Sequence, residues 1–591
     1  MAVTGHPRLG AGDGDGRVTR VAGPLVELAG LGNVAVFDIA EVGTDRLPGE
    51  VVAIDGDRVT AQLYEYTGGL APGMPARSRG EPLSARLGPG LLGGVFDGLL
   101  RPLTDPLAGP LAGAAAWLRP GARRGGEPPR FRFRPSARPG DEVAPGARLG
   151  VAVGAGGIEE AVVAPPGAAG RLAWVAGERL AGVDDVVARV EGRDVGLTAR
   201  WPVRRPRPSR CRLDATVPLA TGQRVLDLLF PVAKGSTAAV VGGFGTGKTV
   251  LLQQVAKWCD ADVIVYVGCG ERGNELADVI DELQALEDPR TSRRLAERTV
   301  IIANTSNMPV MAREASIYTG MTVAEYFRDQ GLDVVLIADS TSRWAEALRE
   351  FSSRSGELPA EEGFPAGLAS ALAAFYERAG RVETLAGGQG SVTVVAAVSP
   401  PGGDMAEPVS AHTQRFVRSL WTLDRDLAYA RHYPAVSWRA SFSRDVASLA
   451  AWHTRNGDAG WAARRARLHA LLAEADHLRS VAELVGTAAL PGRERVVLLA
   501  ARLAREAVLQ QSALSPNDAT CGLAKQSALA GAVLAVHDRA QALVRDGRPA
   551  TLLEAAGYAP LLRAGAELGP DDAAGVTARR DQVLAALERP A

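Results

Sequence analysis

Short runs of β-branched residues alternate with turn residues in the first part of the chain. Between Arg17 and about Arg101, apolar runs such as Val51–Ile54 and Val59–Tyr64 are separated by Gly, Pro and Asp. Strands of this length with turns between them are typical of small antiparallel β structures. We therefore expect an N-terminal β-barrel over residues 17–101, after a flexible tail over residues 1–16.

A second segment punctuated by Gly and Pro follows the predicted barrel. It contains predicted strands at Arg171–Val175 and Val186–Val190, again separated by turn residues. We expect residues 102–203 to form an inserted β-rich module with its linkers.

The rest of the chain changes first to an α/β pattern and then to a helical one. From residue 204 to residue 441, apolar strand runs such as Val263–Gly268 alternate with helical periods, which predicts a parallel sheet covered by helices. After residue 442, Ala, Leu, Arg and Glu recur at helical spacing, as in Arg493–Leu509. We expect a central α/β domain over residues 204–441 and a C-terminal α-helical domain over residues 442–591.

Composition narrows the class of protein. With 591 residues the chain exceeds the size of a single hydrophobic core, which agrees with several domains. A formal net charge of -1 provides no basic surface for nucleic acid or for an anionic membrane. No segment reaches the roughly 18 to 20 apolar residues that cross a bilayer, and the four cysteines lack the spacing of a zinc site. We expect a cytoplasmic chain without a nucleic-acid partner.

A glycine-rich loop carries the strongest chemical signal. It matches the phosphate-loop pattern GxxxxGK[ST] and lies between a predicted strand, Ala238–Val241, and a predicted helix, Val250–Lys257. In this arrangement N–H groups and a helix N-terminus face a polyphosphate. Lys248 would contact the β- and γ-phosphates of ATP, and the Thr249 hydroxyl would bind Mg²⁺. The predicted nucleotide-binding residues here are Gly242, Gly243, Phe244, Gly245, Thr246, Gly247, Lys248, Thr249 and Val250.

Acidic residues follow two of the predicted strands. The strand Asp333–Asp339 ends in a carboxylate where P-loop enzymes hold the water shell of Mg²⁺, so Asp339 is the second predicted metal residue. Another strand leads into a loop with Glu271, Arg272 and Glu275. A carboxylate there would polarise the attacking water, and the arginine would neutralise charge on the γ-phosphate. The pattern leaves open which acid does so, and it also fits a solvated helix N-terminus.

Taken in order, these segments resemble the catalytic A subunit of vacuolar and archaeal-type rotary ATPases from Arg17 to about Arg539. The motifs that carry the resemblance are Gly93–Gly98, Thr221–Asp227, Gly270–Glu275, Asn304–Pro309, Asp339–Glu350, Ser399–Asp404 and Arg431–Ala435. The resemblance implies a β-barrel, an inserted bulge domain, a RecA-like nucleotide domain and a helical domain. It also implies Mg-ATP hydrolysis or synthesis, coupled by partner subunits to the movement of an ion, expected to be the proton.

The resemblance further implies partners and residue roles. Three A and three B subunits would alternate in a ring around a central rotor stalk, with a peripheral stalk and a membrane sector, at the inner face of the cell membrane. Glu271 would activate water, with Glu275 second in rank, and Arg272 would contact phosphate. Tyr433 would stack on adenine, and a neighbouring chain of the ring would supply the arginine that stabilises the transition state.

Three loop positions can be compared with the family pattern. Gly243 stands where most prokaryotic members carry proline, which we expect to loosen the loop without removing a phosphate donor. Thr246 stands where eukaryotic members place a redox-sensitive cysteine, so that disulfide is not available here. Phe244 agrees with the family, which carries an aromatic residue at this position.

Two other classes of protein compete with this interpretation. The non-catalytic B subunit of the same ring lacks the intact Gly-Lys-Thr loop and the long inserted module, both of which this chain has. A hexameric RNA-tracking or secretion ATPase shares the RecA-like domain, but RNA tracking would require a basic, aromatic-lined module, which the predicted barrel lacks.

Overall fold

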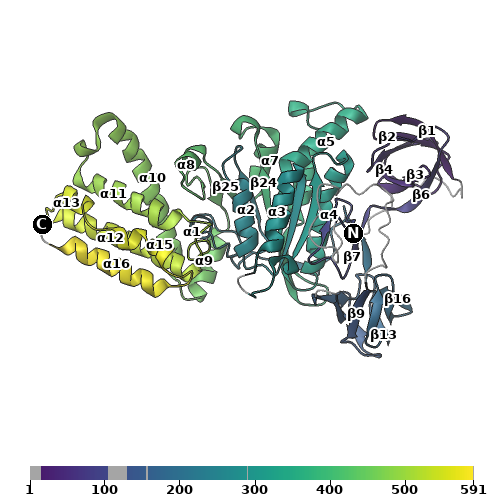
Figure 1. Cartoon of the computed structure of the whole chain (residues 1–591), viewed down its shortest axis with the longest axis horizontal. Coiled ribbons are helices and arrows are strands. Elements are labelled where there is room, and N and C mark those ends of the chain that lie inside the picture. The colour runs from purple at the N-terminus through teal and green to yellow at the C-terminus, as the bar shows by residue number, and fades with distance from the viewer. Residues whose placement is uncertain (1–14, 104–129, 155–156, 289–290, 590–591) are drawn as a thin grey trace.

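The computed structural model of the chain describes residues 15–103, 130–154, 157–288 and 291–589. The tail predicted over residues 1–16 therefore lies almost wholly outside the described residues, as do residues 104–129 of the predicted inserted module. The described parts follow one another along the long axis of the molecule. The helical domain lies at one end, the α/β domain in the centre, and the barrel and the inserted module at the other end (Figure 1).

The predicted N-terminal barrel is confirmed as a closed antiparallel barrel with the strand order β1-β2-β5-β4-β3-β6. Alternate side chains such as Val26, Leu28 and Val59 fill its interior, as the two-residue period of a strand requires. Its strands are β1 (Gly16–Ala22), β2 (Leu25–Ala29), β3 (Asp38–Val42), β4 (Leu47–Asp55), β5 (Arg58–Leu63) and β6 (Pro75–Pro82).

The barrel ends earlier than the expected residue 101. Strand β7 (Ser84–Leu87) pairs with β17 (Ala199–Pro202), which leads out of the inserted module. Strand β8 (Val95–Phe96) pairs in parallel with β21 (Thr299–Thr305) of the central sheet, and both of its residues are buried. The segment after β6 is therefore a connection built into the neighbouring domain.

The inserted module consists of two four-stranded antiparallel sheets in its described residues. Both predicted strands, Arg171–Val175 and Val186–Val190, are present, as β13 and β15. One sheet has the order β12 (Glu159–Val163), β11 (Arg148–Val153), β9 (Arg130–Pro135), β14 (Arg179–Gly182). The other has the order β10 (Glu142–Val143), β13 (Gly170–Val175), β15 (Val186–Val190), β16 (Arg193–Gly196).

The central domain is built on one mainly parallel sheet, as the alternating pattern predicts. From edge to edge it contains β26 (Phe442–Ser443), β25 (Ser419–Thr422), β19 (Thr237–Val241), β24 (Gln389–Val398), β22 (Asp333–Asp339), β20 (Val263–Glu271), β21 (Thr299–Thr305) and β8. Strands β18 (Cys211–Leu213) and β23 (Gly380–Glu383) pair beside β24. Because β26 pairs with β25, the sheet continues two residues beyond the expected boundary at residue 441.

Helices cover both faces of this sheet. Apolar side chains of α2 (Lys248–Trp258) and α3 (Gly273–Ala285) pack on one face, together with α1 (Arg224–Leu229) and part of the helical domain. The opposite face is covered by α4 (Val310–Arg328), α5 (Thr341–Ser355), α6 (Leu368–Glu377) and α7 (Pro408–Phe416). Strands with covered faces on both sides need apolar residues throughout, which explains the continuous apolar runs in the sequence.

The C-terminal domain is helical, as predicted. Its core helices α10, α11, α12 and α16 pack against one another through buried Leu, Val and Ala side chains. The helices are α9 (Val446–Arg455), α10 (Trp461–Val485), α11 (Gly492–Leu503), α12 (Leu523–Arg545), α13 (Ala550–Glu554), α14 (Ala559–Leu562), α15 (Ala564–Glu567) and α16 (Ala573–Glu588). A π-helix, Ala504–Leu509, continues α11.

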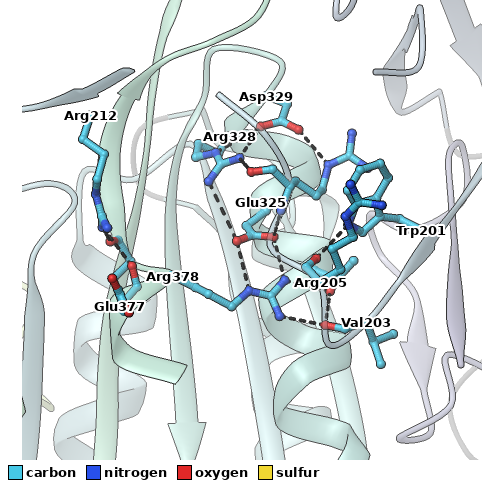
Figure 2. Close-up of polar contacts among 12 residues, drawn as sticks. Trp201, Val203, Arg205, Arg212, Glu325, Arg328, Asp329, Glu377 and Arg378 are labelled. Carbon is cyan, nitrogen blue, oxygen red and sulfur yellow. Dashed lines mark hydrogen bonds and ion pairs between the residues drawn. The ribbon is translucent and has the colours of Figure 1, made fainter. Parts of the chain in front are cut away.

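Buried ion pairs fix the linker that enters the central domain (Figure 2). Arg378 donates to both carboxylate oxygens of Glu325, at 3.0 and 2.6 Å, and to the carbonyl oxygen of Val203 at 2.7 Å. Arg207 donates to Asp329 at 2.7 Å. Charges this deep in the protein are tolerated only when they are paired and hydrogen-bonded. The linker is thereby held against the C-terminal end of α4.

The four cysteines differ in their exposure. Cys259, Cys269 and Cys521 are buried, whereas Cys211 on β18 is exposed. Burial raises the pKa of the Cys269 thiol to about 12. None of the four is in a disulfide.

Candidate nucleotide site

The glycine-rich loop connects β19 to α2, as predicted. Gly245 and Gly247 have φ angles of +78° and +92°, a left-handed conformation that glycine adopts without steric cost. Lys248 opens the helix, and its ammonium donates to the carbonyl oxygens of Gly242 at 2.7 Å and Gly243 at 2.9 Å. The lysine side chain therefore folds back across its own loop.

Two other loop residues differ in exposure. Thr246 is buried and donates from its hydroxyl to the Gly243 carbonyl at 2.8 Å, so this position has a structural role in the loop. Phe244 is 90% exposed at the rim of the cleft. A Cβ at Gly243 would lie 3.3 Å from a guanidinium nitrogen of Arg425, which packs beside the loop.

The acidic ends of β20 and β22 lie side by side, because Gly268 pairs with Asp339 in the sheet register. Asp339 is buried and accepts a hydrogen bond from the Tyr266 phenol at 3.0 Å. Burial raises the pKa of Asp339, while the Tyr266 hydrogen bond and the charge of Lys248 act in the opposite direction. Burial also lowers the pKa of Lys248, partly offset by the charges of Asp339 and Glu271. The three charged groups are therefore electrostatically coupled.

The segment expected to be a loop with two acids is divided between a strand and a helix. Strand β20 continues to Glu271, and α3 begins at Gly273, so Glu275 lies in the first turn of that helix. Arg272 is exposed and lies 3.7 Å from the Glu275 carboxylate. Glu275 thus has the position of a helix N-terminal acid, which the macrodipole favours.

Glu271 has a different environment. Burial and the neighbouring charge of Asp339 raise its pKa to about 7, although Arg343 and a hydrogen bond from Ser340 act in the opposite direction. A carboxylate with a pKa near 7 can accept a proton efficiently at neutral pH.

A cleft of about 1400 Å³ brings these groups together. Of the predicted site residues, Gly242 alone does not line it, and Gly242 acts instead through its carbonyl on Lys248. Tyr433 lies over the loop, since a Cβ on Gly247 would be 3.7 Å from its ring. The helical domain also lines the cleft, with residues 510–514 among others.

The pattern of the sequence did not identify several residues in this cleft. Arg313, Arg343 and Arg425 line it, and Gln511 donates from its main-chain N–H to the Tyr433 carbonyl at 2.8 Å. Arg343 comes four residues after Asp339, so its position just beyond the end of a predicted strand could have marked it as a candidate cleft residue. Gln511 is distant in sequence from the loop and has no local motif, so only the tertiary structure reveals it.

The residues of the cleft fit a bound Mg²⁺. Thr249 and Asp339 both line the cleft and offer a hydroxyl and a carboxylate, which are hard oxygen donors, and Mg²⁺ in such sites takes few protein ligands besides phosphate and water. The described part of the chain contains no cluster of three His, Cys, Asp or Glu side chains that could hold a metal ion.

The fold and the cleft define a P-loop nucleotide-binding protein, and family models agree. Residues 222–443 match the nucleotide-binding domain of the ATP synthase alpha/beta family, and residues 450–552 match the C-terminal domain of V and A type ATP synthase. Residues 18–80 match the beta-barrel domain of the alpha/beta family, and residues 127–204 match its barrel-sandwich domain.

Relatives extend over nearly the whole chain. The V-type ATP synthase alpha chain of Anaeromyxobacter dehalogenans strain 2CP-1 is 53% identical over 584 residues, covering 97% of this chain and 99% of the relative. The A subunit of the A-type ATP synthase from Methanosarcina barkeri is 46% identical over 536 residues, covering 90% and 92%. The chain therefore belongs to the family of V-type and A-type ATP synthase alpha, or A, chains. Its activity is that of an ATP hydrolase or synthase in a rotary ATPase.

A solved structure shares this fold. The ATPase EscN of an enteropathogenic E. coli type III secretion system superposes with a TM-score of 0.62, over 88% of this chain and 100% of that chain. At 21% sequence identity the likeness concerns the fold alone. None of the described helices is long and apolar enough to span a bilayer.

Proposed function

We propose that the cleft binds Mg-ATP and that Glu271 is the base that activates the attacking water. One observation carries this proposal: Glu271 and Asp339 end adjacent strands and share the electrostatic environment of Lys248. As the water oxygen attacks the γ-phosphorus and the bond to the β-phosphate oxygen breaks, Glu271 takes the proton. Glu275, in the first turn of α3 and beside Arg272, is the weaker candidate.

The other site residues have binding roles in this proposal. Lys248 moves from the carbonyls of its own loop to the β- and γ-phosphates. Thr249 and Asp339, the latter through water, hold Mg²⁺, which neutralises phosphate charge when it is bound. Arg272 is exposed at the mouth and contacts the γ-phosphate.

The base of the nucleotide lies at Tyr433 in this proposal. This side chain is 44% exposed and lines the cleft beside Gly247 at the start of α2. A stacked aromatic ring contributes about 1–3 kcal/mol per base in nucleic-acid complexes, a useful scale for this contact.

We further propose the assembly that the family implies. The chain alternates with B subunits in an A3B3 ring on central and peripheral stalks, and partner subunits move an ion, the proton, across the membrane. The ring would lie at the inner face of the cell membrane. Support comes from the match of residues 450–552 to the C-terminal domain of V and A type ATP synthases.

Paired carboxylate-to-amide substitutions test the catalytic assignment. In the assembled head, Glu271→Gln should still bind Mg-ATP and lose hydrolysis, because the amide keeps the size of the side chain and cannot accept a proton. Glu275→Gln is the matched control and should retain most of the activity. If Glu275→Gln is the more damaging change, the assignment of the base is wrong.

A further inference from the structure

A buried arginine joins the central domain to the wall of the cleft that the helical domain provides. Arg224 begins α1 and is 1% exposed. Its Nε donates to the carbonyl of Val508 at 2.6 Å, and its Nη2 donates to the carbonyl of Gln510. Its Nη1 donates to Asp518 Oδ1 at 2.5 Å. All three of these acceptors belong to the helical domain.

The carbonyls that Arg224 binds lie at the end of a π-helix. Residues Ala504–Leu509 form this element, and the last carbonyls of a helix lack partners within it. π-Helical turns are frequent at functional sites. Here the turn delivers residues 510–514 to the cleft, so Arg224 fixes the point where that segment leaves the helix.

The same segment is tied directly to the proposed adenine residue. The Gln511 N–H donates to the Tyr433 carbonyl at 2.8 Å, and its side-chain carbonyl accepts the N–H of Arg224 at 2.8 Å. Its amide nitrogen donates to the Gly222 carbonyl at 2.8 Å. One side chain thus connects the start of α1 to the segment whose main chain holds Tyr433.

Asp518 completes this arrangement. It accepts from Arg224 through Oδ1 and from the Ser512 N–H through Oδ2 at 2.7 Å, so it closes the segment into a loop. Gly565 lies directly behind the pair, since a Cβ there would be 2.9 Å from Asp518 Oδ1. The buried ammonium of Lys525 donates to the carbonyls of Gly565 at 3.2 Å and Leu568 at 2.9 Å.

We propose that Arg224 is a positioning residue for the nucleobase end of the cleft: with Asp518 and Gln511 it holds residues 510–514 against Tyr433. This inference rests on the proposed placement of adenine at Tyr433. The phosphate end is built from a different part of the domain, the loop between β19 and α2. Loss of Arg224 therefore weakens binding of the base and leaves binding of the phosphates intact.

Binding of two ligands to the purified full-length chain would distinguish an effect on the base from an effect on the phosphates. Isothermal titration would compare Mg-ATP with Mg-tripolyphosphate, which lacks base and sugar. Arg224→Met should weaken Mg-ATP binding about tenfold, equivalent to about 1.4 kcal/mol, and should change the affinity for tripolyphosphate less than about twofold. Arg224→Lys keeps the charge but not the fork that reaches several acceptors, so it should be intermediate.

Arg465→Met is the matched control. Arg465 on α10 donates to the Leu229 carbonyl at 2.9 Å, so it bridges the same two domains at the other end of α1 without contacting the segment. It should bind both ligands as wild type does. If Arg224→Met does not fold, Asp518→Asn tests the same arrangement and should show the same ligand selectivity.

Different outcomes test the positioning role of Arg224 and the proposed nucleotide site separately. Equal weakening of both ligands, or no weakening of either, in a folded Arg224 variant overturns the positioning role. A wild-type chain that binds tripolyphosphate and ATP equally tightly overturns the placement of adenine at Tyr433 instead. A wild-type chain that binds neither ligand contradicts the proposed nucleotide site as a whole.

Discussion

The phenol of Tyr266 donates a hydrogen bond to Asp339 across two neighbouring strands, with 3.0 Å between the oxygens. Tyr266 is buried in the middle of β20, and its hydroxyl therefore fixes the orientation of the carboxylate that ends β22. Groups that orient a metal ligand commonly contribute tenfold to a hundredfold to metal affinity.

Removal of this hydroxyl should raise the Mg²⁺ requirement. Tyr266→Phe should need about tenfold more Mg²⁺ for half-maximal ATP hydrolysis by the assembled head, with little change in maximal rate. Tyr326→Phe is the control, because its hydroxyl contacts the Ala161 carbonyl, away from the cleft. An unchanged Mg²⁺ dependence in Tyr266→Phe would show that Asp339 does not depend on this bond for its metal role.

Lys248→Ala should abolish turnover and sharply weaken Mg-ATP binding. Its ammonium already lies over the loop carbonyls, and no other lysine of the described residues lines the cleft. The substitution would remove two charge-assisted hydrogen bonds to the β- and γ-phosphates, at about 1.5–3 kcal/mol each. We therefore expect Mg-ATP binding to weaken on the order of a hundredfold or more. Lys257→Ala, at the other end of α2, should bind as wild type. Wild-type affinity in Lys248→Ala would refute the phosphate-loop assignment.

We also predict that a contact between the inserted module and the connection after β6 depends on pH. Glu160 on β12 accepts the Gly90 N–H at 2.6 Å, and burial raises its pKa to about 8. The folded chain therefore keeps a proton that the unfolded chain loses above its ordinary pKa of 4.5. The contribution of Glu160 to the free energy of unfolding is therefore greatest below pH 4.5. It is lost as the pH rises from there to about 8, by up to about 1.4 kcal/mol per pH unit.

Glu160→Gln should remove this pH dependence, because the amide is neutral throughout. Thermal unfolding followed from pH 5 to pH 9 should show a smaller decline for this variant than for the wild type. Glu159→Gln changes an exposed neighbour that pairs with Arg134 and should leave the decline unchanged. Parallel curves for wild type and Glu160→Gln would contradict the prediction.

The isolated chain should bind nucleotide and hydrolyse it very slowly. In this proposal the transition-state arginine comes from a neighbouring chain of the ring, and such a residue is worth about 10³ to 10⁵ in rate. Addition of the B partner at constant concentration of this chain should raise turnover steeply, only where size-exclusion chromatography shows the ring. Full activity from a demonstrated monomer would favour a self-contained ATPase.

Local patterns were sufficient for much of the fold and for the phosphate end of the site. The loop before Lys248 and the strand ending in Asp339 have short, ordered signatures, and both lie where they were expected. The end of β20 could not be predicted from the sequence, because the pairing of Glu271 with Thr305 in the neighbouring strand decides where β20 ends. Sequence spacing contains no information about that partner.

The base end of the cleft could not be predicted in the same way. Arg224 lies in a motif shared with the family, yet its acceptors on Val508, Gln510 and Asp518 are almost 300 residues away. Main-chain carbonyls are the same for every residue type, so no side-chain pattern marks them. Such contacts become visible only when two domains are placed together.

The unequal exposure of the four cysteines offers a practical route to watching the motor. Maleimide dyes react with accessible thiols, and Cys211 is the exposed one, on a strand outside the residues that line the cleft. A fluorophore or a gold particle could therefore be attached to the native chain at a single point, without engineered substitutions. In an assembled ring, the number of labels per particle would report how many copies of this chain the ring contains.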